Sequence, residues 1–430
     1  MRYLIIALIL LMQNAYADSL KIIVNSPIDQ VKPNQKCDQD ICKTLLDLIN
    51  ESKSSIDFAI YGLRGQPEIL DALINADQRG VIIRGIVDKD IDDNNFYGDT
   101  PLLEKYFKDK IKDDFKYDLK TKQMLSNIQY SQNKACERPK NSLGPLQCFE
   151  GKGYASKDPF PFKGDIMHNK FFIVDGQYLW TGSANISDTG TGGYNANNVV
   201  IIDSSFVALK YLEEFNKMYG GDFHRGKDKS REDEVRNQIV STNIDSSEVV
   251  ILFSPKNYAM EKVERLIDSS QESIDLSIFF LTYNKVVKKL VNAHDRGVSV
   301  RVIIDATGAS NGYSKHQYLR DQGMEVKVEN WGGKMHMKTA VIDNKHIVIG
   351  SMNWTDAGVT KNDENTLIIK NDIKNSKYLT NHFNEMWTSI PNKWLVQDPE
   401  AESLDSVNSC FDGSDNDFDE MTDGNDSKCI

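Results

Sequence analysis

The sequence predicts an α/β protein that is built from two copies of one domain. Strand-like stretches of apolar residues alternate with segments of helical spacing, which is typical of a layered α/β architecture. The same order of segments occurs twice along the 430 residues. A chain of this length is long enough to form two domains with ample cores.

An internal repeat supports the duplication. Residues 55–61 (SIDFAIY) correspond to residues 273–279 (SIDLSIF), and residues 79–88 correspond to residues 296–305, where Arg-Gly-Val leads to Arg and then Asp in both copies. Similarity that recurs over several segments in the same order indicates a duplicated domain. The predicted divisions are a first domain over 18–245, a second domain over 246–398 and a tail over 399–430.

Within each copy, the elements follow from their residue patterns. Apolar side chains at residues 56, 58 and 60 of the first copy predict a strand. Residues 67–78 have apolar side chains at helical spacing, with Pro67 in the first turn and Gly80 after the end, which predicts a helix. The β-branched residues over 81–87 then predict a second strand.

The two copies differ in length after this second strand. The first copy contains about fifty additional residues, and this insertion covers about residues 92–162 with Cys136 and Cys148. One interpretation is a surface excursion held by a disulfide. The other is a lid or a substrate-selecting loop near the functional site, and both stay open.

The N-terminus predicts export. Arg2 precedes an apolar run over residues 3–12, and Ala15-Tyr16-Ala17 follows. This is the order of a secretory signal peptide, residues 1–17, with cleavage near Ala17. The run is shorter than the roughly 20 residues of a membrane-spanning helix, and no later segment is apolar enough to span a bilayer. We therefore expect a periplasmic or secreted protein.

The cysteine content fits the same compartment, because exported proteins retain disulfides. The six cysteines leave the connectivity open, and pairing of sequence neighbours is our expectation: Cys37 with Cys42, Cys136 with Cys148, and Cys410 with Cys429. A zinc site is the alternative, but the sequence contains no Cys-x-x-Cys pair that would favour it. The net charge of −12 disfavours a nucleic-acid partner, although a local basic groove can coexist with an acidic whole.

One motif occurs in both copies and carries the candidate chemistry. It reads His-x-Lys-x₄-Asp-x₆-Gly-Ser-x-Asn and spans residues 168–185 and 336–353. Residues i and i+2 of a strand share a face, so the His and the Lys of each motif project together. A hairpin turn at Asp175 or Asp343 returns Gly-Ser-x-Asn to their side. Two histidines suit covalent phosphodiester cleavage, in which one attacks and the other protonates the leaving oxygen.

The candidate residues follow from these roles. Lys supplies the positive charge that attracts a phosphate, and Ser and Asn supply uncharged hydrogen bonds. The predicted catalytic residues are His168, His336, Lys170, Lys338, Asp175, Asp343 and Glu364. The predicted phosphate-binding residues are Ser183, Asn185, Ser351 and Asn353.

Three carboxylates of this set differ in their expected roles. Asp175 and Asp343 lie on the strand face opposite to the His-Lys pair, so we expect them to hold the turns or to pair with a neighbouring basic group rather than contact substrate. A carboxylate that orients an imidazole is also required. Glu364 is the candidate for the second copy and His336, whereas Asn197 stands at the matching position of the first copy. The two motifs are therefore not chemically equivalent.

The doubled motif resembles the signature of the phospholipase D superfamily, and the resemblance extends to about residue 398. It implies two tandem phospholipase D-like α/β/α sandwich domains related by a pseudo-two-fold axis, with the active site at their interface and no metal cofactor for catalysis. It also implies that His168 forms a phosphohistidine, that His336 protonates the leaving alcohol, and that the motif lysines and asparagines bind the phosphate. Asn197 favours the alternative that His336 is the better-oriented imidazole.

The substrate has three candidate classes. The signal peptide and the acidic charge favour phospholipid head-group hydrolysis at a membrane surface. Trp354-Thr355, which follow the second motif directly, resemble the corresponding residues of the nuclease and cardiolipin-hydrolase branch of the superfamily. An endonuclease acting on DNA or RNA is therefore the alternative. A non-catalytic phospholipid-binding module is a distant third, because both histidines are intact. No obligate protein partner is inferred.

The tail is a separate signal. Residues 410–429 are bounded by two cysteines and are rich in aspartate, which offers oxygen ligands at the spacing of calcium loops. Phe418 and Asp419 stand where an EF-hand loop needs Gly, so a structural calcium ion and a solvated acidic tail are both open interpretations. The candidate ligands are Asp412, Asp415, Asp417, Asp419 and Asp423.

Overall fold

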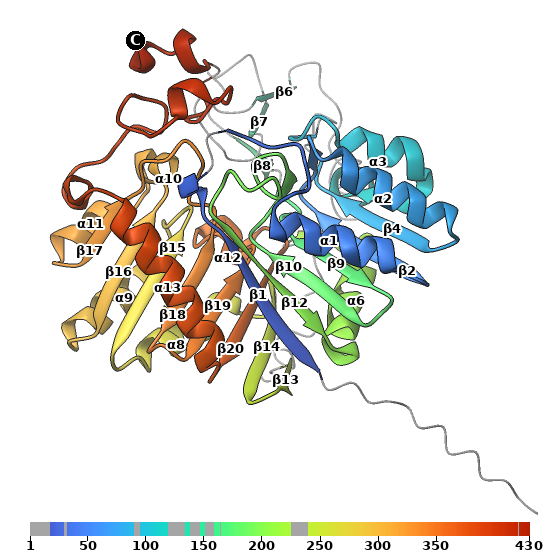
Figure 1. Ribbon diagram of the computed structural model, residues 1–430, viewed down its shortest axis with the longest axis horizontal. Coiled ribbons are helices and arrows are strands. Elements are labelled where there is room, and N and C mark those ends of the chain that lie inside the picture. The colour runs from blue at the N-terminus through green and yellow to red at the C-terminus, as the bar shows by residue number, and fades with distance from the viewer. Residues whose placement is uncertain are drawn as a thin grey trace, which may run out of the picture.

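The computed structural model describes residues 18–29, 32–89, 95–118, 134–137, 147–150, 159–163, 165–224, 240–419 and 421–430. Two sheets flanked by helices lie next to each other, the first coloured blue to green and the second yellow to red (Figure 1). The predicted signal peptide lies outside the described residues. None of the described helices combines the length and the apolar character that a bilayer crossing requires.

The first domain contains a seven-stranded mixed sheet. Its strands, in sheet order, are β1 (Ser19–Asn25), β12 (Asn197–Asp203), β10 (Tyr178–Gly182), β9 (Lys170–Val174), β2 (Ser55–Ile60), β4 (Ile82–Val87) and β5 (Ile111–Asp113). The strands from β1 to β2 pair antiparallel, and β2, β4 and β5 pair parallel.

The second domain contains an eight-stranded sheet. Its strands, in sheet order, are β13 (Val240–Ile244), β14 (Ser247–Ser254), β20 (Glu364–Lys370), β19 (His346–Gly350), β18 (Lys338–Ile342), β15 (Ser273–Ile278), β16 (Ser299–Ile304) and β17 (Glu325–Val328). From β14 onwards, the order and the strand directions repeat those of the first sheet. The topology therefore confirms the duplication that the sequence predicted.

This correspondence changes two boundaries. β13 pairs with β14, so the second sheet begins before residue 246. The predicted insertion over 92–162 was wrong at its start, because β5 lies inside it and is the counterpart of β17. The sequence comparison missed β5 since this strand has only three residues. Beyond it, β6 (Lys134–Glu137), β7 (Gln147–Glu150) and β8 (Pro159–Lys163) form a separate sheet.

Helices cover both faces of each sheet, which confirms the sandwich architecture. On the outer faces, α1 (Asp40–Glu51) packs with α2 (Pro67–Gln78), and α8 (Ala259–Asp268) packs with α9 (Asn284–Asp295). On the inner faces lie α6 (Ser205–Tyr219) and α13 (Ile373–Ser389). The predicted helix over 67–78 coincides with α2, where Pro67 takes the first turn.

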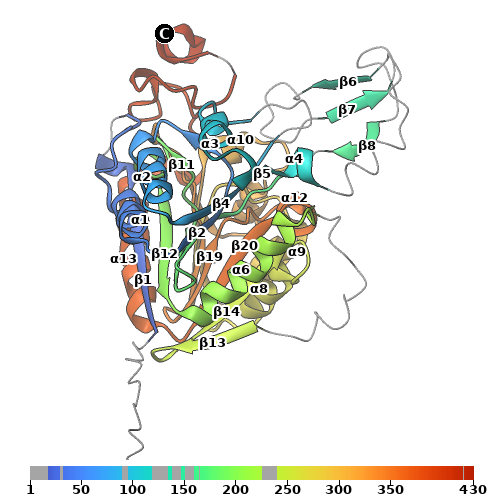
Figure 2. The same cartoon turned by 90° about the vertical axis from the view of Figure 1, so that its right-hand side faces the viewer.

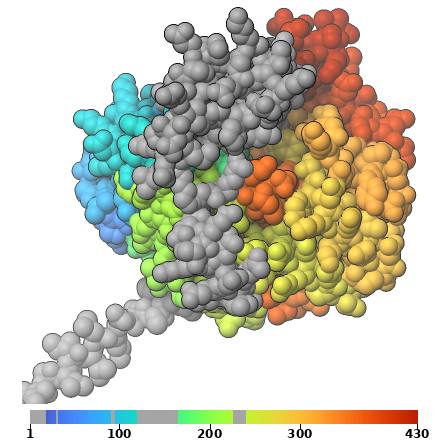
Figure 3. Space-filling model, turned by 180° about the vertical axis from the view of Figure 1, so that it is seen from behind, coloured from blue at the N-terminus to red at the C-terminus, as the bar shows by residue number. Residues whose placement is uncertain are grey.

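The inner faces of the two sheets share one hydrophobic core. Buried side chains of both sheets and of α6 belong to a single cluster, in which Phe171 and Phe215 of the first domain join Phe253 and Leu367 of the second. Helix α6 contacts β14 of the other domain, and α13 contacts β1. Seen from behind, the first domain (blue to green) lies beside the second domain (yellow to orange) (Figure 3). Burial of this extent fixes how the domains sit against each other.

Short elements connect the layers. Among the described residues, the remaining helices are α3 (Thr100–Phe107), α4 (Asp114–Tyr117), α10 (Ala306–Ser310), α11 (His316–Asp321) and α12 (Asp356–Thr360). The two-stranded sheet consists of β3 (Leu63–Arg64) and β11 (Ile186–Ser187). The 3₁₀ turns are η1 (Pro27–Asp29), η2 (Lys108–Lys110), η5 (Asn392–Leu395), η6 (Ser409–Phe411), η7 (Asp423–Asn425) and η8 (Ser427–Cys429).

Two of the three expected disulfides are confirmed. Cys37 pairs with Cys42, and Cys410 pairs with Cys429, so the latter bond closes the acidic tail into a loop. The backbones of Cys136 and Cys148 lie opposite each other across β6 and β7, while their side chains are outside the description. The tail lies above the sheets in Figure 2, at the end that is near α10.

Candidate active site

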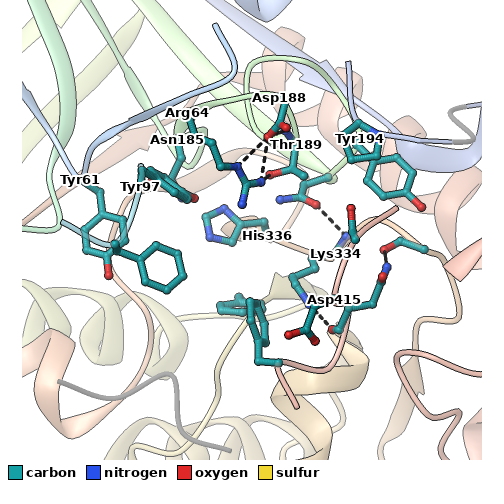
Figure 4. A pocket seen from close by; sticks show the side chains of 18 of the residues that line it. Tyr61, Arg64, Tyr97, Asn185, Asp188, Thr189, Tyr194, Lys334, His336 and Asp415 are labelled. Atoms are coloured by element: carbon teal, nitrogen blue, oxygen red, sulfur yellow. Dashed lines mark hydrogen bonds and ion pairs between the residues drawn. The ribbon is translucent and has the colours of Figure 1, made fainter. Parts of the chain in front are cut away.

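A cavity of about 600 Å³ lies between the two domains and contains both motif histidines. His168 and His336 line it, and each is less than a tenth exposed. Figure 4 shows His336 between residues of the first domain, such as Arg64, and Asp415 of the tail. The structure thus brings together two histidines that are far apart in the sequence.

The two hairpins that carry the motif form as predicted. β9 pairs with β10, and β18 pairs with β19. Asp175 and Gly176 have φ values of 55° and 62°, which is the left-handed backbone of a tight hairpin turn. The histidines themselves precede their strands, since β9 begins at Lys170 and β18 begins at Lys338.

The residues that orient the histidines come from the opposite domain, which corrects the sequence prediction. Nδ1 of His168 lies 2.8 Å and 3.0 Å from the two carboxylate oxygens of Glu364. Nδ1 of His336 lies 3.1 Å from Oδ1 of Asn197 and 3.1 Å from the carbonyl oxygen of Ser183. Glu364 therefore orients His168 rather than His336, and the alternative that His336 is the better-oriented imidazole was wrong.

Backbone contacts between the domains explain this exchange. The amide of His168 donates a hydrogen bond of 2.9 Å to the carbonyl of Asp363, and the amide of His336 donates one of 3.0 Å to Ala196. These acceptors directly precede the two orienting residues. Within one sheet, by contrast, β19 separates β20 from β18, a distance of roughly 10 Å that places the orienting residue of the same domain out of reach.

A third buried histidine, His224, contacts Asp363, the residue whose carbonyl accepts the hydrogen bond from the amide of His168. His224 lies 3.1 Å from carboxylate oxygens of both Asp114 and Asp363. Burial opposes its charge, but the two carboxylates raise the pKa of His224 well above the ordinary value. These contacts give His224 a structural role.

The motif serines brace the orienting residues. Oγ of Ser351 donates 2.7 Å to Glu364, and Oγ of Ser183 donates 2.9 Å to Asn197. Both serines are fully buried and neither lines the cavity. Their predicted contact with phosphate stays a prediction. In this structure their hydroxyl groups hold the side chains that face the histidines.

The motif lysines lie buried beneath the histidines. Nζ of Lys170 donates 2.9 Å to the carbonyl of His168, and Nζ of Lys338 donates 2.6 Å to the carbonyl of His336. Burial lowers the pKa of Lys170 to about 7, against the raising effect of Glu364. Burial and the charge of Lys170 lower the pKa of Lys338 well below its usual range. A bound anion would raise the lowered pKa values of both lysines, as expected of a phosphate site.

Both motif histidines have a lowered pKa in this structure. Burial lowers the pKa of His168 and of His336 well below the ordinary value, and the charges of Lys170 and Lys338 lower it further. Burial raises the pKa of Glu364 to about 8. The carboxyl group of Glu364 lies within hydrogen-bond distance of Nδ1 of His168. A proton held at Nδ1 leaves Nε2 with the lone pair that a nucleophile needs.

The motif aspartates lie away from the cavity. Asp175 accepts hydrogen bonds of 2.7–3.1 Å from the amides of residues 53–55, and Asp343 does the same for residues 271–273. These bonds hold each hairpin turn to the start of β2 or β15, which confirms the turn-holding role. Placing the two aspartates in the catalytic set was wrong, because the strand separates them from the histidines.

The motif asparagines do line the cavity. Nδ2 of Asn185 donates 2.9 Å to the hydroxyl of Tyr97. Oδ1 of Asn185 and Oδ1 of Asn353 are buried without a hydrogen-bond partner among the described residues. Both residues belong to the cavity wall, where an amide group can hydrogen-bond a polar substrate.

Sequence reasoning missed the aromatic wall of the cavity. The ring centroid of Tyr61 lies 5.3 Å from that of His168, and the ring of Phe279 lies 5.1 Å from that of His336. Tyr61 and Phe279 occupy the same position of the internal repeat, so aligning the copies could have found them. Tyr97 stacks with Arg64, whose guanidinium pairs with Asp188 at 2.8 Å.

The tail is a second missed part of the site. Asp412, Asp415, Asn416 and Phe418 line the cavity. Of the five predicted calcium ligands, Asp415, Asp417 and Asp419 belong to carboxylate clusters in which Glu402 and Asp426 also take part. Asp412 and Asp423 are outside these clusters: Asp412 accepts from the hydroxyl of Tyr194, and Asp423 accepts from the amides of residues 412 and 413.

A comparison with known protein families finds a match for this chain. A family model described as "Cardiolipin synthase, PLD-like domain" matches residues 45–219 and 263–387, which together cover more than half of the chain and include both motifs. The match falls on the two duplicated units and leaves out the tail.

Two relatives illustrate the similarity. A protein named phospholipase D from Rickettsia conorii is 29% identical over 143 residues, covering 33% of this chain and 72% of that protein. Human mitochondrial cardiolipin hydrolase is 30% identical over 142 residues, covering 33% of this chain and 56% of that protein. Each match thus spans a stretch close to the length of one domain.

One solved structure resembles the whole arrangement. Phosphatidylserine synthase from Haemophilus influenzae aligns with a TM-score of 0.55 at 13% identity, and the alignment covers 86% of each chain. At this identity the similarity shows the fold alone, and it includes both domains.

The turn-holding role of Asp343 predicts a loss of stability. Asp343→Ala should lower the free energy of unfolding by about 1–3 kcal/mol, because three backbone amides lose their acceptor. Those amides lower the pKa of Asp343, so its contribution is present above the ordinary pKa and is lost as the pH falls through the lowered value. Urea unfolding measures both effects, with Asp343→Asn as the milder control. Unchanged stability would contradict this role.

The contact between Asn197 and His336 predicts a shift in pKa. Asn197→Asp places a negative charge beside Nδ1 and should raise the pKa of His336 by about 1–3 units. A titration of the imidazole signals by nuclear magnetic resonance measures it, with Asn75→Asp on the exposed face of α2 as the matched control. A shift at His168 alone would show that the crossed pairing is wrong.

Proposed function

Because the chain belongs to the phospholipase D superfamily of phosphodiesterases, we propose that it hydrolyses phospholipid head groups through a phosphohistidine at His168. The observation that supports this proposal most directly is the hydrogen bond between Nδ1 of His168 and Glu364. Of the two histidines in the cavity, His168 is the one that faces a carboxylate. A carboxylate stabilises the positive charge that an imidazole acquires when its Nε2 bonds to phosphorus.

The first chemical step transfers the phosphoryl group to the enzyme. Nε2 of His168 attacks phosphorus, and the bond between phosphorus and the oxygen of the head-group alcohol breaks. His336 donates its Nε2 proton to that oxygen, so the alcohol leaves neutral. The amide of Asn197 orients His336 without adding negative charge, which keeps its proton easy to donate.

The second step returns the enzyme to its starting state. His336, now neutral, takes a proton from water while the water oxygen attacks phosphorus. The bond between phosphorus and Nε2 of His168 breaks, and phosphatidic acid leaves. His336 ends protonated and His168 ends neutral, so protons and bonds balance over the cycle.

We propose that catalysis needs no metal cofactor. The charge on the transferring phosphoryl group is met by Lys170 and Lys338, whose lowered pKa values mean that a bound anion stabilises their charged forms. Asn185 and Asn353 add hydrogen bonds from the cavity wall. These four groups supply the electrostatic stabilisation that a metal ion provides in other phosphodiesterases.

The cavity supports a phospholipid rather than a nucleic acid. Aromatic rings of both domains line it, and the tail adds Asp412 and Asp415 on one side. Carboxylates in the cavity wall repel a polyanionic strand, whose binding depends on neutralising several phosphates. They do not oppose a head group that carries a positive charge, and rings and carboxylates together suit such a group. We further propose an exported protein, which the two disulfides support.

A side-by-side assay tests the substrate class. The mature protein is incubated with vesicles of phosphatidylcholine and phosphatidylethanolamine, and separately with plasmid and single-stranded DNA, each with and without EDTA. Head-group release in EDTA without DNA cleavage is the expected result. DNA cleavage without lipid turnover would favour the endonuclease, and vesicle binding without release would favour the non-catalytic binding module.

The two-histidine mechanism predicts the effect of single substitutions. His168→Ala and His336→Ala should each lower kcat/KM by about 10³-fold or more, because neither histidine can perform both roles. His294→Ala, on α9 outside the cavity, serves as the matched control and should retain full activity. Near-normal turnover by either active-site variant would contradict the mechanism.

A further inference from the structure

The acidic tail forms part of the wall of the active-site cavity. Its segment over residues 412–418 contacts both domains there. On the second domain, the hydroxyl of Thr307 donates 3.0 Å to the carbonyl of Asn416, and Nζ of Lys334 lies 4.2 Å from the ring centroid of Phe418. On the first domain, the hydroxyl of Tyr194 donates to Asp412. The position of this segment therefore determines the shape of the cavity.

Directly behind this wall, five carboxylates crowd together. They form two sets that share Asp417, and the ligand atoms within each set lie within 4.8 Å of one another. The first set is Glu402, Asp415 and Asp417, and the second is Asp417, Asp419 and Asp426. Among the described residues, the cation that pairs with them is Lys428, whose Nζ lies 2.7 Å from Asp417. One ammonium group does not balance five carboxylates at this spacing.

Buried oxygens within the cluster point to a missing positive charge. Asp426 is 1% exposed, and its Oδ2 has no hydrogen-bond partner among the described residues. Oδ1 of Asp417 is buried and unpartnered in the same part of the chain. A buried carboxylate oxygen without a donor is costly, and a cation that binds both oxygens removes this cost.

We propose that this cluster binds Ca²⁺ and that the bound ion holds the tail as a wall of the active-site cavity. Ca²⁺ takes six to eight oxygen ligands in flexible geometry, which suits carboxylates that come from separate turns. Asp415 belongs both to the cluster and to the cavity wall, so it links the ion to the cavity. The Cys410–Cys429 disulfide keeps the ends of the tail together when the ion leaves.

The ion acts on substrate binding rather than on the chemical step. Without it, mutual repulsion of the carboxylates moves residues 412–418, while the histidines keep their orientation because the domain interface holds them. The Michaelis constant therefore rises on removal of Ca²⁺, and kcat changes less. This effect on turnover rests on the proposed function, whereas the binding of the ion does not.

Calorimetric titration of the EDTA-treated mature protein tests the binding. CaCl₂ should bind more tightly than MgCl₂, because Mg²⁺ requires a stricter octahedral geometry. Asp417→Asn and Asp419→Asn should each weaken binding by about tenfold or more, whereas Asp405→Asn, an exposed tail residue outside the cluster, should bind as the wild type does. Absence of binding by the wild type, a preference for Mg²⁺, or unchanged binding by both cluster variants would overturn the site.

Two further measurements test the link to the cavity. Hydrogen exchange of residues 410–419 should slow on addition of Ca²⁺, and this readout does not depend on turnover. Kinetics with bis(p-nitrophenyl) phosphate should show a Michaelis constant that is several-fold higher in EDTA. Unchanged exchange together with an unchanged Michaelis constant would overturn the link. If the protein turns over no phosphodiester in either condition, the proposed function fails, and calorimetry and hydrogen exchange still decide the calcium site.

Discussion

The interface between the two domains is the constraint on which the site depends. One hydrophobic core joins the inner faces of the sheets, and two backbone hydrogen bonds cross between the domains next to the histidines. Because these bonds place Glu364 beside His168 and Asn197 beside His336, neither domain alone holds an oriented imidazole. The duplication therefore supplies two half-sites, and docking of the domains completes both of them at once.

Exchange of the orienting residues also breaks the symmetry of the site. The surrounding groups are equivalent: each histidine has a lysine beneath it, a serine behind its orienting residue and an aromatic ring at its edge. The difference is a carboxylate facing His168 and an amide facing His336. A carboxylate favours an imidazole that becomes positively charged, whereas an amide favours one that gives up its proton. In the proposed mechanism, one substituted residue thus assigns different roles to two copies of the same motif.

Much of the fold could be predicted from the sequence, because it is encoded locally. The helix over 67–78, the paired hairpins and the repeated strand order all follow from residue patterns within one copy. The crossed pairing of Glu364 could not be predicted, since it depends on how two separate sheets dock. The contacts of the serines with the orienting residues could not be predicted for the same reason, because a hydroxyl is suited equally to phosphate and to a buried carboxylate. The aspartates of the tail could be recognised in the sequence, but the position of the tail against the cavity could not be predicted from it.

Mapping the covalent adduct tests the crossed arrangement most directly. Wild-type protein is mixed with bis(p-nitrophenyl) phosphate, denatured at alkaline pH within one turnover to preserve the phosphorus–nitrogen bond, and digested for mass spectrometry. The account predicts an adduct on the peptide that contains His168, and a reduced amount of it in Glu364→Gln. An adduct on His336, or one whose yield does not depend on Glu364, would contradict the assignment of the nucleophile.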